Sequence, residues 1–261
     1  MTSTARLLEQ RSVGDIRLRM ERDGVAVLRE AGSSKLRLPR GSNEAIFINT
    51  SGGLAGGDRI SISAELGDGA SLVMTSQAAE RVYRTLGPPA VVDVALKVGR
   101  KAELLWLPQE SIFFEGSALE RRLDVSLAEE ARFLAVETMV FGRREMGEVI
   151  SKVSVLDQWN IRRAEKLIHA EAFRLGPDWP RSKATFGDNH ACATLLMIAP
   201  DAEQKLDGLR AVLGPEDGAS FWNGKLVARL LARDSFHLRK TLIQVVSVCV
   251  GCHGLPKTWT F

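Results

Sequence analysis

Residues 249–253 read CVGCH, and C-x-x-C-H is the pattern through which a c-type haem is attached covalently. Two thioether bonds and an axial histidine require an exported chain. The N-terminal residues, MTSTARLLEQRSVGDIRLRM, contain no apolar run of about seven residues that would mark a signal peptide. Three cysteines are also a sparse and odd set for a secreted protein. The pattern therefore favours a structural role for these cysteines over haem attachment, in a cytoplasmic protein.

Cys249, Cys252 and His253 could instead form a soft-metal site. A closed zinc site has four ligands as a rule, and the sequence contains no second C-x-x-C and no H-x-x-x-H. The competing interpretation is the end of a helix, because apolar residues recur here at steps of three and four and a free cysteine packs as a small hydrophobe. The predicted apolar face consists of Leu238, Leu242, Val245, Val246, Cys249 and Cys252.

Three ionisable side chains stand in predicted strands that are otherwise apolar. Glu137 lies in FLAVETMVF, where side chains alternate between two faces. His169 and Glu171 lie on one face of KLIHAEAFRL. An unpaired buried ion costs several kcal/mol, so these groups must be paired, protonated, hydrated or used. The expected same-face neighbours are Phe133, Ala135, Met139 and Phe141 for Glu137, and Leu167, Phe173 and Leu175 for His169 and Glu171.

Two interpretations of these buried groups remain open. They could be halves of satisfied ion pairs. Alternatively, they could line a hydrated interior path, because carboxylate oxygens and imidazole nitrogens are ligands that a transition-metal ion could follow.

A cluster of glycines in NTSGGLAGGDRI is the most constrained local sequence, because Gly52, Gly53, Gly56 and Gly57 permit positive φ and close backbone approach. It is not a Walker A loop, since Asp58 follows where lysine would be required. The cluster is either a sharp connection between strands or a support that holds Asp58 in a groove or channel. The sequence also has no G-x-S-x-G and no H-E-x-x-H, so no catalytic residue is predicted.

The strands that would position these groups recur with a period of about 30 residues. Each unit is a strand, a turn and a second strand, and the second strands begin at Ala70, Ala102 and Ala131, which are 32 and 29 residues apart. Such a unit cannot bury its apolar face alone, so neighbouring units must stack. The units are ISISA with ASLVMT, VVDVALKV with AELLWL, and LDVSL with ARFLAV.

The predicted fold is therefore mainly β, a two-layer, β-helix-like stack of strand-turn-strand units over residues 1–175. A plain sandwich of hairpins is the alternative. A fourth, looser unit is expected in GEVISKVSVLD and EKLIHAEAFRL. Residues 176–261 predict a smaller α+β portion packed on the stack as part of one continuous domain, with helices from Glu203 to Leu213 and from Ser235 onward.

Composition excludes some classes of partner. The chain is 45% hydrophobic and 26% charged, as an ordinary globular protein is. Its net charge of +3 is spread without a basic tract and only one tyrosine is present, so nucleic acid is not an expected partner. The longest apolar runs are far shorter than the roughly 20 residues that a membrane-spanning helix needs.

The chain resembles the urease accessory protein UreD family, also called UreH, over nearly its whole length. The resemblance rests on strings that occur in the same order and spacing: GGLAGGD, TSQAAERVYRT, LPQESIFFEGSAL, VETMVFGRREMGE, AEAFRL and LPKTW. It implies a chaperone without enzymatic activity that joins accessory proteins F and G on urease apoprotein. It also implies support for GTP-dependent nickel insertion, with the GTPase activity in protein G.

The resemblance further implies a mainly β, helix-like fold with no permanently bound cofactor and with nickel only in transit. The family's proposed internal nickel tunnel maps onto Asp58, Glu137 and Glu171, with His169 beside them. Within the matching strings, structural or docking roles fall on Gly52, Gly53, Gly56, Gly57, Tyr83 and Arg143.

Two rival functions stay open at this point. One is a metal-dependent enzyme built on Asp58, His169 and Glu171. The other is a haem or redox carrier that uses CVGCH.

Overall fold

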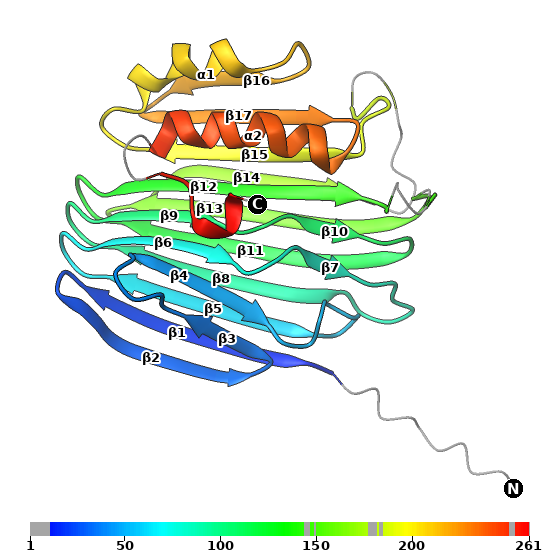
Figure 1. Ribbon diagram of the computed structural model, residues 1–261, viewed down its shortest axis with the longest axis horizontal. Coiled ribbons are helices and arrows are strands. Elements are labelled where there is room, and N and C mark those ends of the chain that lie inside the picture. Colours follow the sequence, from blue (N-terminus) through cyan, green and yellow to red (C-terminus); the bar gives the residue numbers. More distant parts are fainter. Residues whose placement is uncertain are drawn as a thin grey trace, which may run out of the picture.

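Two β-sheets stacked face to face form the body of the protein (Figure 1). The computed structural model describes residues 11–143, 147–148, 150–176, 182, 185–250 and 254–260. The seven-stranded sheet has the order β14 (Lys166–Leu175), β13 (Val153–Arg163), β11 (Ser117–Leu127), β8 (Ala90–Val98), β5 (Arg59–Leu66), β1 (Val13–Glu21) and β2 (Gly24–Gly32). The ten-stranded sheet has the order β16 (Gly218–Trp222), β17 (Lys225–Ala232), β15 (Ala191–Ile198), β12 (Arg132–Phe141), β9 (Glu103–Leu107), β6 (Ser71–Ser76), β4 (Glu44–Asn49) and β3 (Ser34–Arg37), with β7 (Glu80–Val82) and β10 (Ser111–Phe113) beside this path.

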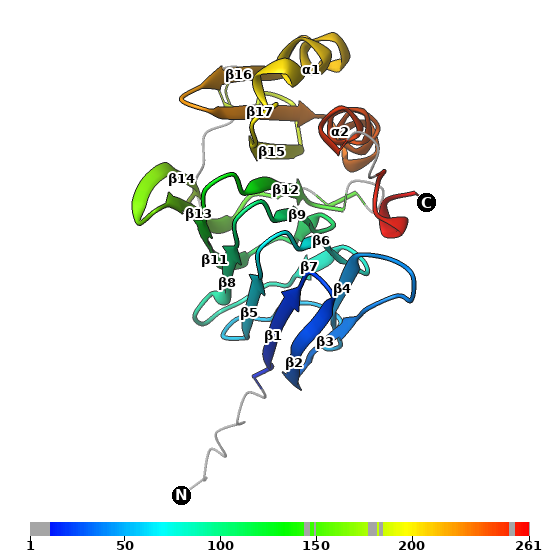
Figure 2. The ribbon, with the colours of Figure 1, turned by 90° about the vertical axis from the view of Figure 1, so that its left-hand side faces the viewer.

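The 30-residue repeat builds this stack, and the prediction of a two-layer, β-helix-like fold is confirmed. In each unit the first strand joins the seven-stranded sheet and the second joins the ten-stranded sheet, as β5 with β6, β8 with β9 and β11 with β12. Equivalent strands pair in parallel, so that Leu66, Val98 and Leu127 form one row. The view along the strands shows the two layers side by side (Figure 2). Because the strands of a unit do not pair with each other, the hairpin sandwich is wrong.

The fourth unit departs from the prediction. β13 extends the seven-stranded sheet in parallel with β11, but β14 turns back and pairs with β13 in antiparallel fashion in the same sheet. The connection consists of only Ala164 and Glu165, which have φ values of 45° and 63°. A two-residue turn with positive φ at both positions makes a hairpin and cannot carry the chain to the other layer.

Two apolar cores lie on opposite faces of the ten-stranded sheet. The first fills the space between the sheets and the second lies beneath the helices. Strand β12 serves both, since Phe133 and Ala135 belong to the first core while Leu134 and Val136 belong to the second. This explains why almost every residue of β12 is buried, whereas β11 alternates between buried and more exposed positions.

Helices lie on the outer face of the ten-stranded sheet, over the second core (Figure 1). In the described part of the chain they are a 3-10 turn (Glu203–Lys205), α1 (Leu206–Val212), α2 (Ser235–Val250) and a further 3-10 turn (Lys257–Trp259). The predicted apolar face of α2 is confirmed over its described part, with Leu238, Leu242, Val245, Val246 and Cys249 all buried. Gly251, Cys252 and His253 lie outside the described residues, so a metal site at CVGCH stays untested.

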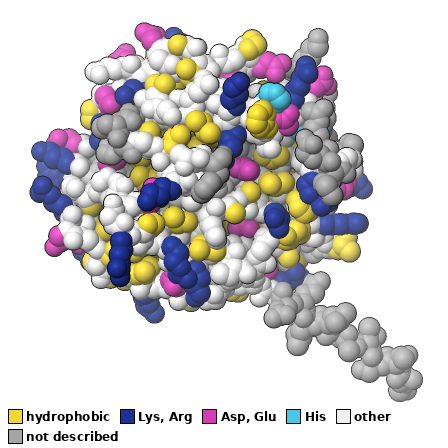
Figure 3. Space-filling model, in the orientation of Figure 1, with side chains coloured by type: hydrophobic (Ala, Val, Ile, Leu, Met, Phe, Trp, Pro, Cys, Tyr) yellow, Lys and Arg dark blue, Asp and Glu magenta, His cyan; other side chains and the backbone are white. Residues whose placement is uncertain are grey.

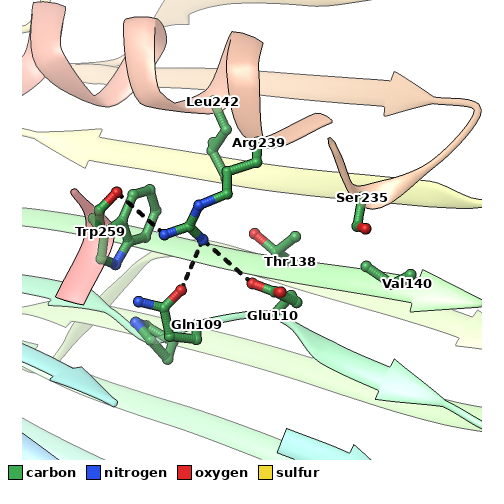
Figure 4. Close-up of a pocket in the computed structure, with 9 residues that line it drawn as sticks. Gln109, Glu110, Thr138, Val140, Ser235, Arg239, Leu242 and Trp259 are labelled. Carbon is green, nitrogen blue, oxygen red and sulfur yellow. Dashed lines mark hydrogen bonds and ion pairs between the residues drawn. The ribbon is translucent and has the colours of Figure 1, made fainter. Parts of the chain in front are cut away.

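The C-terminal residues close the edge of the second core. Trp259 is buried and donates from its indole Nε1 to the carbonyl of Leu107 at 3.0 Å. The guanidinium of Arg239 binds the carbonyl of Trp259 at 3.2 Å, Gln109 Oε1 at 2.8 Å and Glu110 Oε2 at 3.5 Å (Figure 4). Thus α2 ties together the LPQES and LPKTW strings, which are about 150 residues apart in the chain.

The outer surface is mixed in charge. On the face seen in Figure 3, basic and acidic side chains are both scattered among apolar and neutral ones. None of the helices in the described part of the chain is long and apolar enough to cross a membrane.

The packing of α2 generates a stability prediction. Leu242 is 3% exposed, so Leu242→Ala leaves a cavity in the second core and should lower the free energy of unfolding by about 2 to 5 kcal/mol. Phe236→Ala on the same helix is the matched control, because Phe236 is 73% exposed and its loss should change the free energy by no more than about 0.5 kcal/mol. Urea unfolding measures both, and equal losses would contradict this account of the packing.

Candidate functional site

A cluster of three charged side chains lies between the sheets. Arg121 on β11 makes a two-pronged contact with Asp157 on β13, with Nε to Oδ1 at 2.9 Å and Nη2 to Oδ2 at 2.8 Å. Its Nη1 lies 2.5 Å from Oε2 of Glu137 on β12, in the other sheet. All three side chains are at most 7% exposed. Glu137 is therefore part of an ion pair, as one of the two interpretations expected. The pair is unequal in charge, because a single arginine contacts two carboxylates.

Two indoles complete this cluster. Trp106 Nε1 donates to Glu137 Oε1 at 2.8 Å, and Trp159 Nε1 donates to Asp157 Oδ2 at 3.2 Å. Burial raises the pKa of Glu137 from its ordinary value near 4.5 to about 7; Arg121 opposes this effect, and the charge of Asp157 adds to it. Glu137 consequently changes its charge near neutral pH.

Two interior cavities meet at Glu137. The larger lies against Trp106, Glu80, Arg121 and Glu137, and the centre of a water molecule can enter about 40 Å³ of it. The smaller is lined by Glu137, Asp157 and Glu171 among others and offers about 10 Å³. About 10 to 15 Å³ is enough for one water. The interior therefore has room for a few water-sized occupants in the larger cavity and for one at most in the smaller cavity.

Glu171 connects the smaller cavity to an open groove along β14. Its Oε1 lies 2.8 Å from Arg229 Nη2, and its Oε2 lies 3.5 Å from His169 Nε2. Burial acts to raise the pKa of Glu171, but His169 and Arg229 together outweigh it, so the pKa lies below its ordinary value. The groove has a volume of about 530 Å³ and is also lined by Lys225 and Trp222.

The side chains predicted to share one face of β14 do so, except near the start of the strand. His169, Glu171 and Phe173 point inward, but Leu167 is 47% exposed. The pairing shifts between Ile161 and Arg162, because Ile161 faces His169 while Arg162 faces Leu167. This bulge turns Leu167 outward, so the expectation that Leu167 shares the face is wrong.

Glu80 marks the far side of the larger cavity. Asn49 Nδ2 lies 3.2 Å from both carboxylate oxygens of Glu80. Burial raises the pKa of Glu80 to about 7 against these hydrogen bonds, and the charge of Asp58 acts in the same direction as burial. One cavity thus carries two carboxyl groups that titrate near pH 7, the half-buried Glu80 and the buried Glu137.

Asp58 organises the glycine cluster. Its Oδ1 accepts from the backbone N–H of Ser12 at 2.7 Å, and its Oδ2 accepts from that of Ala55 at 2.8 Å. Both carboxylate oxygens therefore bind backbone N–H groups. The carboxylate fastens the loop to the chain before β1, as expected if the glycine cluster is a sharp connection between strands.

The glycines act for different reasons. Gly52, Gly53 and Gly57 have φ values of 77°, 146° and 84°, so the expected positive φ is confirmed at these three. Gly56 does not have positive φ, so the expectation is wrong there; a Cβ at Gly56 would instead overlap the side chain of Thr85. The constraint at Gly56 is close approach.

Tyr83 joins this loop to a second group of surface residues. Its hydroxyl donates to the carbonyl of Gly52 at 2.9 Å, and its ring meets that of Phe114 edge to face at 5.2 Å. The guanidinium of Arg143 lies 4.2 Å from the centre of the Phe114 ring and pairs with Glu148 at 2.9 Å. We call Gly52, Gly53, Tyr83, Phe114 and Arg143 the glycine-loop patch.

The structure brings some of the predicted site residues together and not others. Glu137, Glu171 and His169 follow one another along the interior and the groove. Asp58 precedes β5, which is four strand spacings from β14, or about 19 Å. Among the described residues, no group of three or more His, Cys, Asp or Glu side chains is placed to hold a metal ion.

Sequence reasoning missed four residues of this site. Arg121 and Asp157 complete the buried cluster, Glu80 lines the larger cavity, and Cys192 lines the smaller one. The first two could have been found by strand alternation, since both occupy inward positions between apolar residues.

The chain is thus a two-layer, β-helix-like protein whose interior carries a succession of ionisable groups. A family model described as UreD urease accessory protein matches residues 12–259. Urease accessory protein UreD of Brucella suis is 46% identical over 249 residues, covering 92% of this chain and 89% of that protein. The UreD proteins of a Chelativorans species and of Mesorhizobium japonicum are each 45% identical, covering 94% and 89% of this chain and 91% and 87% of those proteins. The chain belongs to the UreD family of urease accessory proteins.

Substitutions in the glycine cluster should separate the cost of positive φ from the cost of a Cβ that overlaps neighbouring atoms. Gly53→Ala should destabilise the protein more than Gly52→Ala, because a Cβ at Gly53 would overlap the Tyr83 ring and the backbone carbonyl of Arg81, whereas the space around Gly52 is open. Both have positive φ, so both variants should lose at least about 1 kcal/mol. Thermal unfolding compares them, and an equal loss would show that crowding adds nothing to the backbone strain.

The raised pKa of Glu137 predicts a pH dependence. The carboxyl group of Glu137 stays protonated up to about pH 7 in the folded state but only up to about pH 4.5 in the unfolded state. The group therefore stabilises the fold fully below pH 4.5, and this contribution is lost as the pH rises through 7. The difference in free energy of unfolding between wild type and Glu137→Gln should therefore decrease as the pH rises from about 4.5 to about 7. Urea unfolding at several pH values measures the difference, with exposed Glu65→Gln as control. Parallel curves for wild type and Glu137→Gln would contradict the shift.

Proposed function

We propose that this chain is a non-catalytic scaffold of urease maturation in the cytoplasm. In this proposal it docks on urease apoprotein together with accessory proteins F and G, and a nickel ion passes through its interior during GTP-dependent delivery. Membership of the UreD family supports the urease part of the proposal. The geometry of the interior supports the path.

The main support for the proposal is that neighbouring cavities share lining residues. The larger cavity shares Glu137 with the smaller, and the smaller shares Glu171 with the open groove. Glu80 lies on the larger cavity and His169 on the groove. An ion that moved from one cavity to the next would meet a carboxylate at each boundary.

The chemistry of these groups suits a divalent cation in transit. Carboxylate oxygens and neutral imidazole bind nickel and related ions, and negative charge raises the local concentration of a cation. Glu171 is ionised at neutral pH because its pKa is lowered, whereas Glu80 and Glu137 titrate near pH 7. The attraction along the path therefore strengthens as the pH rises through 7.

The rival enzyme would need Asp58, His169 and Glu171 at one metal ion. Asp58 uses both carboxylate oxygens on backbone amides and lies about four strand spacings from the other two. The scaffold proposal needs no such common site.

For docking, we assign the glycine-loop patch. It combines an aromatic pair with Arg143, and aromatic residues and arginine are enriched where protein partners bind. The patch is rigid because the Asp58 carboxylate and the Tyr83 hydroxyl hold the loop in one conformation.

The path is tested by Glu137→Gln and Glu171→Gln. Each keeps the side-chain shape and removes the charge, and neither strands a buried cation, because Arg121 keeps Asp157 and Arg229 is 60% exposed. We expect melting temperatures within a few degrees of wild type and markedly lower nickel content of urease after reconstitution with proteins F and G, GTP, bicarbonate and limiting nickel. Exposed Glu65→Gln is the matched control and should load normally.

Two results would count against the path. Normal nickel loading by both variants would remove these positions from it. Poor loading together with a collapsed melting temperature would mean that the two carboxylates serve only the fold.

A further inference from the structure

Arg121 stands at the boundary between the two interior cavities. It lines the larger cavity together with Glu137, while Glu137 and Asp157 line the smaller one. The guanidinium contacts both carboxylates, so it fills the space between them. Its Nη1 also points toward Ser111 Oγ, at 3.4 Å, on the wall of the larger cavity.

The arginine changes what the boundary offers to a metal ion. Glu137 Oε2 has no hydrogen-bond partner besides its ion pair with Arg121, and both Asp157 oxygens are taken by the guanidinium fork. An arginine side chain stays charged in proteins, so the positive charge cannot be removed by titration. A divalent cation that approaches from the larger cavity therefore meets a fixed like charge where the two carboxylates would otherwise bind it.

We propose that Glu137 and Asp157 form a binding site for a divalent transition-metal ion that Arg121 occupies, and that such an ion crosses between the cavities only by displacing the guanidinium. This proposal rests on the interior path proposed above and adds its gate. The displaced side chain has acceptors in the larger cavity, where Ser111 and Glu80 lie. The ion replaces one positive charge with two beside two carboxylates, so the exchange leaves no buried carboxylate without a cation.

The imbalance of charge makes the exchange feasible. One guanidinium faces two carboxylates, so a single positive charge lies between two negatively charged groups. A divalent cation would match the two negative charges where arginine does not. In this structure the Arg121 guanidinium, with one positive charge, occupies the place that a divalent ion with two would take.

Arg121→Met tests the proposal directly with the purified full-length chain. Methionine keeps much of the length and removes the charge, so the two carboxylates become available to Ni²⁺. We expect Arg121→Met to bind Ni²⁺ at least about tenfold more tightly than wild type in equilibrium dialysis at pH 8, and Ni²⁺ to raise its melting temperature more than that of wild type. Arg122→Met is the matched control, because Arg122 is the next residue of the same strand, has the same charge and points to solvent.

Further variants keep the test decisive. Arg121→Met with Asp157→Asn should lose the gain in affinity, since one of the two ligands becomes neutral. If Arg121→Met alone does not fold, Arg121→Lys serves in its place, because lysine keeps the charge but cannot make the two-pronged contact. Its Ni²⁺ affinity should exceed that of wild type. Folded Arg121 variants that bind no more Ni²⁺ than wild type and Arg122→Met would overturn the proposal.

The outcome is separable from that of the path. The dialysis uses no urease and no partner, so it can succeed while the Glu171 and Glu137 variants load urease normally. In that case the cation site stands and the delivery role fails. The opposite result is also possible: the Glu137 and Glu171 variants load less nickel into urease, while the Arg121 variants bind Ni²⁺ no more tightly than wild type. That result would support the interior path and overturn the gate at Arg121.

Discussion

The contact of Arg121 with Asp157 and Glu137 is the interaction on which the interior depends. It is a charged link between the two sheets inside a core that is otherwise apolar, and it joins β11 and β13 to β12. Arg121 is the only cation of the cluster, so its removal would leave both carboxylates without a counter-ion, and leaving a buried charge alone typically costs about 3 to 5 kcal/mol. The same contact prevents close apolar packing at that level of the stack. Small cavities lie on both sides of these ions.

The unequal lengths of the two sheets determine where the interior opens. The seven-stranded sheet ends at β14, whereas the ten-stranded sheet continues through β15, β17 and β16. Inward side chains beyond β14, such as Arg229 and Lys225, therefore face a groove instead of an opposing strand. The two-residue turn at Ala164 and Glu165 is the local cause, because it keeps β14 in the sheet of β13.

The repeat and the buried carboxylates were predictable from sequence because both depend on local periodicity. Arg121 and Asp157 obey the same alternation as Glu137, but the predicted strand began at Leu123, whereas β11 begins at Ser117, so its inward arginine was overlooked. Their pairing was not predictable, since Asp157 lies 36 residues from Arg121 and meets it only through the register of β11 and β13. The sequence left two roles open for Asp58, because a glycine cluster does not reveal which backbone amides a nearby carboxylate binds.

The position of Trp259 has a consequence for the order in which the chain can fold. Coils β5 to β12 contact their neighbours in sequence, so each can pack on the one before it. The carbonyl of Leu107 and the side-chain amide of Gln109, by contrast, bind Trp259 and Thr258, about 150 residues further along the chain. The outer face of β9 is therefore completed by contacts of high sequence separation, which cost more loop-closure entropy than the contacts between coils. The coils can form first, and the helical side is fastened to them afterwards.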